Sequence, residues 1–150
     1  MVSVFDRTEN AGVLRHLGHG RDPDEAGFGP PPPDVDRWHL GAHPDVVERL
    51  WGTLNGSLPA DARWLVFDGP ALVHPASGTI LALALGTSYA LRLQPGALAE
   101  AVEAGAELVH TYRSVDVTLD LPRAFGPDWA FGSWSDREAD WVLASYHAAD

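Results

Sequence analysis

The chain of 150 residues contains no cysteine and no lysine, and all ten of its basic residues are arginine. Without cysteine there can be no disulfide, no thiolate nucleophile and no Cys-ligated zinc. Without lysine there can be no Schiff-base lysine and no P-loop lysine. The heavy use of alanine, glycine, proline and arginine is typical of a GC-rich genome, so we expect a bacterial protein.

Long apolar runs are also missing. Residues 80–86 (ILALALG) are far shorter than the roughly 18 apolar residues of a membrane span. The first ten residues, MVSVFDRTEN, have neither the basic region nor the apolar region of a signal peptide. We therefore expect, by elimination, a cytoplasmic protein that does not associate with a membrane.

Acidic residues outnumber arginines in every third of the chain, and the net charge is −11. Because no segment is basic, the sequence has no footprint for a phosphate backbone, and we expect no nucleic-acid binding. A charge far from zero keeps a protein soluble. It can also steer the protein toward a basic partner. Both explanations remain open.

Residue patterns predict an α+β fold. Strands are expected at 63–67, 71–74, 79–86, 88–94, 107–112 and 114–121. Helices are expected at 8–20, 44–54, 95–105 and 135–149. Tight turns between neighbouring strands imply antiparallel pairing. We expect a single domain over residues 1–150, with a mostly antiparallel sheet of about five to six strands and three to four helices packed on one face as a single layer pair.

The last of these helices carries two specific expectations. Ser135 and Glu138 have the spacing of a capping box. The buried stripe is expected to contain Ala139, Val142, Leu143 and Tyr146, with Trp141 away from it.

Two stretches are expected to be loops. Residues 21–37 include four consecutive prolines, which cannot donate backbone hydrogen bonds, and we expect a stiff surface loop rather than a ligand for a partner's aromatic groove. Residues 122–133 are rich in turn formers and aromatic side chains. Together with the adjacent sequence, these loops hold Trp38, Trp129 and Trp134. Such tryptophans either bind a partner or clamp a loop onto the domain.

His39 and His43 are four residues apart, a spacing that suits metal binding when both lie on one helix. Pro44, however, is typical of a first helical turn, which puts His43 at the N-cap and His39 before the helix. We therefore expect His43 to help cap the helix, with His39 and Trp38 packed over its first turn. His16 and His19 form a second, weaker pair.

Three other side chains could take part in chemistry. His74 or His110 could be a general base held by Asp68 or Asp116, although a structural histidine at a strand edge is the favoured interpretation. Arg92 lies in an otherwise apolar strand, where it either reaches the solvent face of the sheet or anchors an anion, and the solvent face is favoured. The sequence has no nucleophile elbow and no dinucleotide fingerprint.

Three functional hypotheses follow. The favoured one is a non-enzymatic acidic interaction module, such as an inhibitor or immunity-type protein, which binds another protein with a basic surface and needs no cofactor or metal. The first alternative is a metal-dependent or acid–base hydrolase that uses His39 and His43 with His74 or His110. The second is a small-ligand domain in which aromatic side chains line a pocket and Arg92 meets an anionic group. The candidate partner- or ligand-binding residues are Trp38, His39, His43, Arg92, Trp129 and Trp134.

Overall fold

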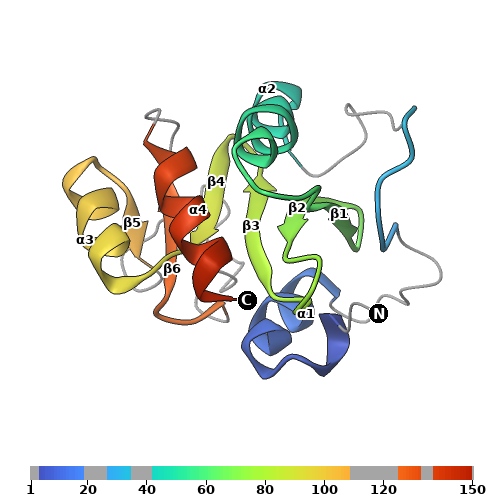
Figure 1. Cartoon of the computed structure of the whole chain (residues 1–150), viewed down its shortest axis with the longest axis horizontal. Coiled ribbons are helices and arrows are strands. Elements are labelled where there is room, and N and C mark those ends of the chain that lie inside the picture. The colour runs from blue at the N-terminus through green and yellow to red at the C-terminus, as the bar shows by residue number, and fades with distance from the viewer. Residues whose placement is uncertain (1–3, 19–26, 35–41, 109–124, 133–136, 150) are drawn as a thin grey trace.

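A computed structural model describes residues 4–18, 27–34, 42–108, 125–132 and 137–149. These residues contain one antiparallel sheet of six strands in the order β1-β2-β3-β4-β6-β5. The strands are β1 (Arg63–Val66), β2 (Gly69–Val73), β3 (Ile80–Leu85), β4 (Ser88–Arg92), β5 (Glu107–Leu108) and β6 (Trp129–Gly132). Figure 1 shows them as one row from β5 at the left to β1 at the right. The predicted α+β fold with an antiparallel sheet is confirmed.

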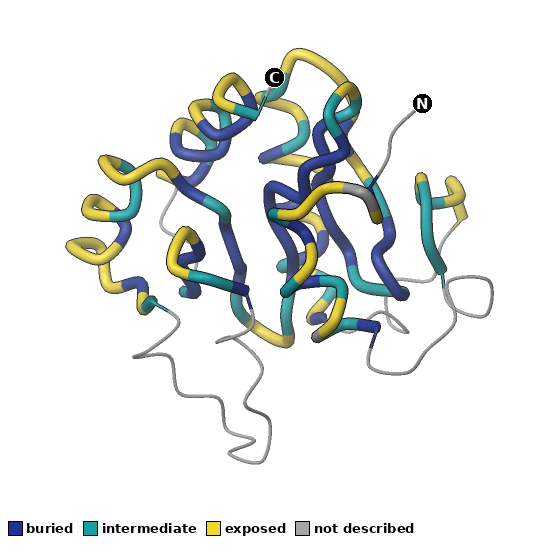
Figure 2. The backbone as a smooth tube through the Cα atoms, turned by 90° about the horizontal axis from the view of Figure 1, so that it is seen from below, coloured by how far each residue is buried: buried dark blue, intermediate teal, exposed yellow. Residues whose placement is uncertain are grey.

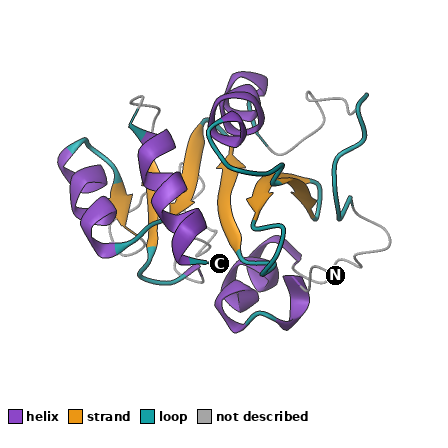
Figure 3. Cartoon of the chain, in the orientation of Figure 1, coloured by secondary structure: helices purple, strands orange, loops and turns teal. Residues whose placement is uncertain are grey.

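Four α-helices lie around this sheet in the described part of the chain (Figure 3). They are α1 (Ala11–Gly18), α2 (Pro44–Glu48), α3 (Pro95–Glu103) and α4 (Glu138–Ala148). Two 3-10 turns, η1 (Val4–Asp6) and η2 (Thr8–Asn10), precede α1, and the π-helical η4 (Arg49–Leu54) continues α2. Both α2 and α3 begin with a proline, whose missing N–H would have no intrahelical acceptor at that position. None of these helices is long and apolar enough to cross a bilayer.

The sheet buries side chains on both of its faces. On one face, which we call the helical face, Leu65, Leu72 and Leu91 pack with residues of α2, η4, α3 and α4. On the other, the N-terminal face, Leu83 and Phe131 pack with η1 and α1. Our expectation of helices on one face only therefore missed the second layer. The nearly continuous apolar run of β3 is the sequence signature of a strand that is buried on both sides.

The expectation of a loop at residues 122–133 is wrong at its end. Residues 129–132 form β6, which pairs with β4 on one side and β5 on the other. The run WAFG is too short for a period to be recognised, and burial on both faces removes the alternation that marks an exposed strand. The strand expected at 114–121 lies outside the described residues.

The buried side of α4 differs in part from the expected stripe. It consists of Glu138, Trp141, Val142, Ser145 and Tyr146. The predicted burial of Val142 and Tyr146 is confirmed. Trp141, which was expected to lie away from the stripe, is also buried, and its Nε1 donates to Glu100 Oε2 of α3 at 2.8 Å. The partner expected in the capping box, Ser135, lies outside the described residues. Figure 2 shows the buried strands at the centre and the exposed outer turns of α3 and α4.

Candidate functional site

His43 occupies the entrance of α2. The Nδ1 atom of its side chain accepts a hydrogen bond from the backbone N–H of Asp45 at 3.1 Å. The backbone N–H of His43 donates to Gly86 O at 2.7 Å. The imidazole therefore satisfies one of the helix's orphan amides, as a good N-cap does. The predicted capping role of His43 is confirmed.

Several of the other candidate residues fall outside the described part of the chain. Trp38, His39, His110, Asp116 and Trp134 lie outside the described residues, as do His19 and the side chain of His16. Within the described ranges, no three His, Asp or Glu side chains lie where they could share a metal ion. The convergence of imidazoles that a hydrolase needs remains a prediction.

His74, at the end of β2, is almost completely buried. Its Nδ1 accepts hydrogen bonds from the backbone N–H groups of Ala76 and Ser77, both at 3.1 Å. Its ring lies against that of Tyr146, with the centroids 4.3 Å apart. These contacts hold the turn between β2 and β3 and correspond to the structural role that the sequence favoured for this residue.

His43 and His74 share a local motif that our sequence analysis missed. Each precedes a proline, and each directs its Nδ1 to the amide two residues further on, that of Asp45 or Ala76. Proline cannot donate, so the following amide is the first donor that the imidazole can reach. The dipeptide His-Pro before a helix or turn was the available signal.

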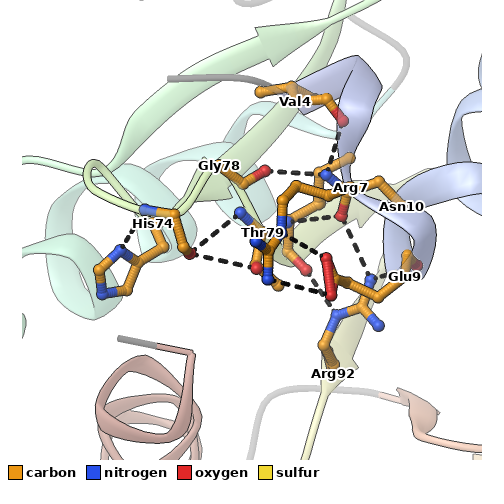
Figure 4. Close-up of polar contacts among 10 residues, drawn as sticks. Val4, Arg7, Glu9, Asn10, His74, Gly78, Thr79 and Arg92 are labelled. Atoms are coloured by element: carbon orange, nitrogen blue, oxygen red, sulfur yellow. Dashed lines mark hydrogen bonds and ion pairs between the residues drawn. The ribbon is translucent and has the colours of Figure 1, made fainter. Parts of the chain in front are cut away.

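Arg92, the last residue of β4, is directed to the N-terminal face (Figure 4). Its Nε donates to Ile80 O at 2.8 Å, and its Nη2 donates to Glu9 O at 2.9 Å. The guanidinium also lies over the Trp129 ring, 4.9 Å from the centroid. The favoured interpretation, that Arg92 reaches solvent, is therefore wrong, because η2 covers this end of the strand.

Burial affects the charge of Arg92. Desolvation lowers the pKa of its guanidinium, while the carboxylates of Glu9 and Asp128 act in the opposite direction. An arginine remains charged in a protein, so its desolvated charge is stabilised by the main-chain carbonyls and the aromatic face. These contacts account for Arg92 without an anionic ligand.

Asn10 is the centre of the same polar cluster, and our sequence analysis did not single it out. Its side chain is fully buried. The Nδ2 group donates to Val4 O at 3.0 Å and to Gly78 O at 2.8 Å, and Oδ1 accepts from the N–H of Ile80 at 2.9 Å. These hydrogen bonds join η1 and η2 to the start of β3 (Figure 4). We call Asn10 and Arg92 with these contacts the polar clamp.

Trp129 is not a loop tryptophan. It is fully buried in β6 and meets the ring of Phe125 edge-on, with the centroids 5.1 Å apart. In this position it contributes to the core and offers no surface to a partner, so the interpretation as a contact residue is wrong for Trp129.

Two small cavities open at the surface of the described residues. One, of about 100 Å³, lies between α2 and the β3–β4 turn and is lined by Asp45, Val46, Arg49, Thr87 and Tyr89. The other, of about 120 Å³, is lined by Pro30, Asp61, Ala62, Arg63, Trp64, Val73 and Pro75. Both are smaller than ordinary ligand pockets of roughly 300 Å³ and more. Neither is lined by Arg92 or Trp129.

A group of acidic side chains lies at the α3–α4 end of the sheet. Glu100, Glu103, Glu107 and Asp140 are all exposed there. Arg137 lies 3.3 Å from Glu100 Oε1, and the other three carboxylates have no ion-pair partner among the described residues. We call this region the acidic end.

Comparisons with protein-family models, curated proteins and solved structures find no match for this chain.

Proposed function

We propose that this chain is a non-enzymatic acidic interaction module that binds a basic surface of another protein. An inhibitor or an immunity-type protein would be one form of it. The observation that supports this proposal is the acidic end, where three exposed carboxylates have no ion-pair partner among the described residues. Elsewhere, Arg7 and Arg63 each pair with an acid two residues away.

The sequence of α3 concentrates this charge at an unusual place. Glu100 and Glu103 occupy the last turn of the helix, which contains no basic residue. The C-terminal end of a helix carries a partial negative charge, so acids there are unfavourable by about 0.3–1 kcal/mol each. A basic partner would relieve this repulsion. Val102 lies between them in sequence, and its side chain is 45% exposed, so it offers the partner an apolar contact beside the two carboxylates.

Neither alternative function has a comparable supporting observation. His43 and His74 direct their Nδ1 atoms to backbone amides, and Arg92 is bound by backbone carbonyls. Trp129, an aromatic candidate for ligand binding, packs into the core together with Phe125.

The test begins with capture of partners from the native cell at low and at high salt, followed by reconstitution with the purified partner. We expect a stoichiometric basic protein whose affinity falls as salt rises, because screening weakens exposed charge pairs. The absence of a stoichiometric partner at low salt would contradict the proposal. So would an affinity that does not depend on salt.

A pair of charge-matched variants then locates the contact. Glu103→Gln with Glu107→Gln removes two charges from the acidic end, and Asp34→Asn with Asp45→Asn removes two exposed charges elsewhere. Residues 27–34 lie at the opposite end of the sheet from α3 (Figures 1 and 2). We expect the first variant to weaken binding about tenfold and the second to weaken it far less. Equal losses would show that only net charge matters.

A further inference from the structure

Residues 27–29 attach a distant part of the chain to the outer edge of β1. Gly29 and Leu65 exchange two backbone hydrogen bonds, of 3.0 and 2.7 Å. The Phe28 ring stacks on that of Phe5 in η1, with the centroids 4.6 Å apart. These contacts fix the position and direction of the chain at the point where its run of prolines begins.

Four consecutive prolines at residues 30–33, which we call the proline segment, follow this attachment. Each proline ring holds φ at about −65°, and a residue that precedes a proline is restricted to extended values of ψ. The proline segment therefore favours a polyproline II helix, which has three residues per turn and no internal hydrogen bonds. The structure agrees with this, because residues 31 and 32 belong to no helix, strand or turn. Figure 1 shows residues 27–34 as an extended piece beside β1.

The burial of the four prolines differs around the segment. Pro31 is half-buried, whereas Pro30, Pro32 and Pro33 are exposed (Figure 2). In a helix with three residues per turn, Pro30 and Pro33 share one edge, Pro32 lies on the second edge and Pro31 on the third. The edge of Pro31 is thus turned toward the domain, and the other two edges form one face toward solvent. We call this the outward face of the proline segment.

The backbone of the proline segment is accessible as well. The carbonyl oxygens of Pro30 and Pro31 accept no hydrogen bond from the described residues. Proline rings and unpaired carbonyls are the two features that an aromatic groove recognises in a polyproline II helix. The rings pack against aromatic side chains, and the N–H of a tryptophan or the O–H of a tyrosine can donate to the carbonyls.

We propose that the proline segment is a binding site for a protein domain that receives its outward face in a groove lined by aromatic side chains. Pro30 and Pro33 have the spacing of a PxxP ligand. A polyproline II helix is already formed before binding, and its attachment to β1 lowers the entropic cost further. The sequence alone favoured a stiff loop without a partner, and the outward face is the observation that assigns it a ligand. This site lies at the opposite end of the sheet from the acidic end, so the two contacts can be tested separately (Figure 1).

An NMR titration of the isotope-labelled full chain tests this, with purified SH3 and WW domains as probes, because both bind polyproline II segments in aromatic grooves. We expect at least one of the two domains to shift the backbone amides of Gly29 and Asp34, which flank the proline segment, and to leave those of α3 unchanged. A free polyproline peptide in excess should reverse the shifts, since it competes for the same groove. If neither domain shifts these amides at about 1 mM, the proposal is overturned.

Single alanine variants then test the outward face. Pro33→Ala should weaken binding about tenfold, because it removes a ring that contacts the groove. Pro31→Ala is the matched control within the segment, since it removes a proline whose ring faces the domain, and we expect it to weaken binding less than about threefold. Pro59→Ala removes an exposed proline outside the segment and should leave binding unchanged. Equal losses for Pro31→Ala and Pro33→Ala would overturn the proposal, as would a loss of binding in Pro59→Ala.

Discussion

The two faces of the sheet are closed by different means. On the helical face, the covering helices contribute eight buried apolar side chains to the core: Val47, Leu50, Trp51, Leu54, Ala101, Trp141, Val142 and Tyr146. On the N-terminal face, η1 and α1 contribute only Val4 and Val13 at comparable burial. The polar clamp of Asn10 and Arg92 lies on this second face.

The two kinds of contact contribute differently to the fold: apolar burial supplies stability, and hydrogen bonds fix the position of a segment. Apolar burial is worth about 25 cal/mol per Å² and does not depend on direction, so it attaches the helical layer firmly without fixing every position. Hydrogen bonds depend on geometry, and a buried donor or acceptor left without a partner costs about 1–3 kcal/mol. The N-terminal segment buries fewer apolar side chains completely, so we expect the polar clamp to contribute most to its position and retention.

Asn10→Ala tests the role of the polar clamp and should cause the largest loss of stability. The substitution leaves Val4 O, Gly78 O and the N–H of Ile80 without their partner. We expect a loss of about 3 kcal/mol in the free energy of unfolding, measured by denaturant titration. Hydrogen exchange should show residues 4–18 opening before β3 and β4.

Asn55→Ala is the matched control, because Asn55 Oδ1 accepts one hydrogen bond, from the N–H of Ala62, in a partly buried position. Its cost should be about 1 kcal/mol. Equal costs for Asn10→Ala and Asn55→Ala would show that apolar packing, not the polar clamp, retains the N-terminal segment.

The next largest effect is a change of stability with pH that comes from Tyr89 on the helical face. Burial, and secondarily the charge of Glu138, raises the pKa of Tyr89 from 10.0 to about 12. The unfolded chain therefore loses this proton at lower pH than the folded chain does. The stabilising contribution is complete below pH 10 and is lost as the pH rises through the folded pKa.

We expect the wild-type protein to lose about 2 kcal/mol more stability than Tyr89→Phe over this alkaline range. Thermal melts of both proteins from neutral to alkaline pH would measure the difference. Parallel stability curves for the two proteins would show that the folded protein accommodates the Tyr89 phenolate and that the helical face is less closed than its contacts indicate.

Local signals made part of this structure predictable. Pro44 and Pro95 marked the starts of α2 and α3, and the cap at His43 follows from its position before Pro44. The turn signals around β2, β3 and β4 placed three central strands within two residues of their observed ends. These features depend on residues that are close in sequence.

The contacts that decide the rest are distant in sequence. Asn10 and Gly78 are 68 residues apart, and Arg92 and Glu9 are 83 apart, so no periodicity could connect them. Trp129 resembled a loop residue because its four-residue strand is defined by β4 and β5 rather than by its own pattern. The acidic end also arises only when α3 and α4 are brought together by the sheet.

The smallest expected effect concerns the entrance of α2, where His43 caps a helix that the helical face already holds by apolar contacts. His43→Ala should cost about 1 kcal/mol or less, because one capping hydrogen bond is lost and the amide of Asp45 can be hydrated instead. His43→Asn should retain most of that stability, since asparagine is among the best N-cap residues. Denaturant titration of both variants measures the difference. If His43 instead belonged to a hydrolytic site, His43→Asn and His43→Ala would both abolish the activity, because neither asparagine nor alanine can transfer protons as an imidazole does.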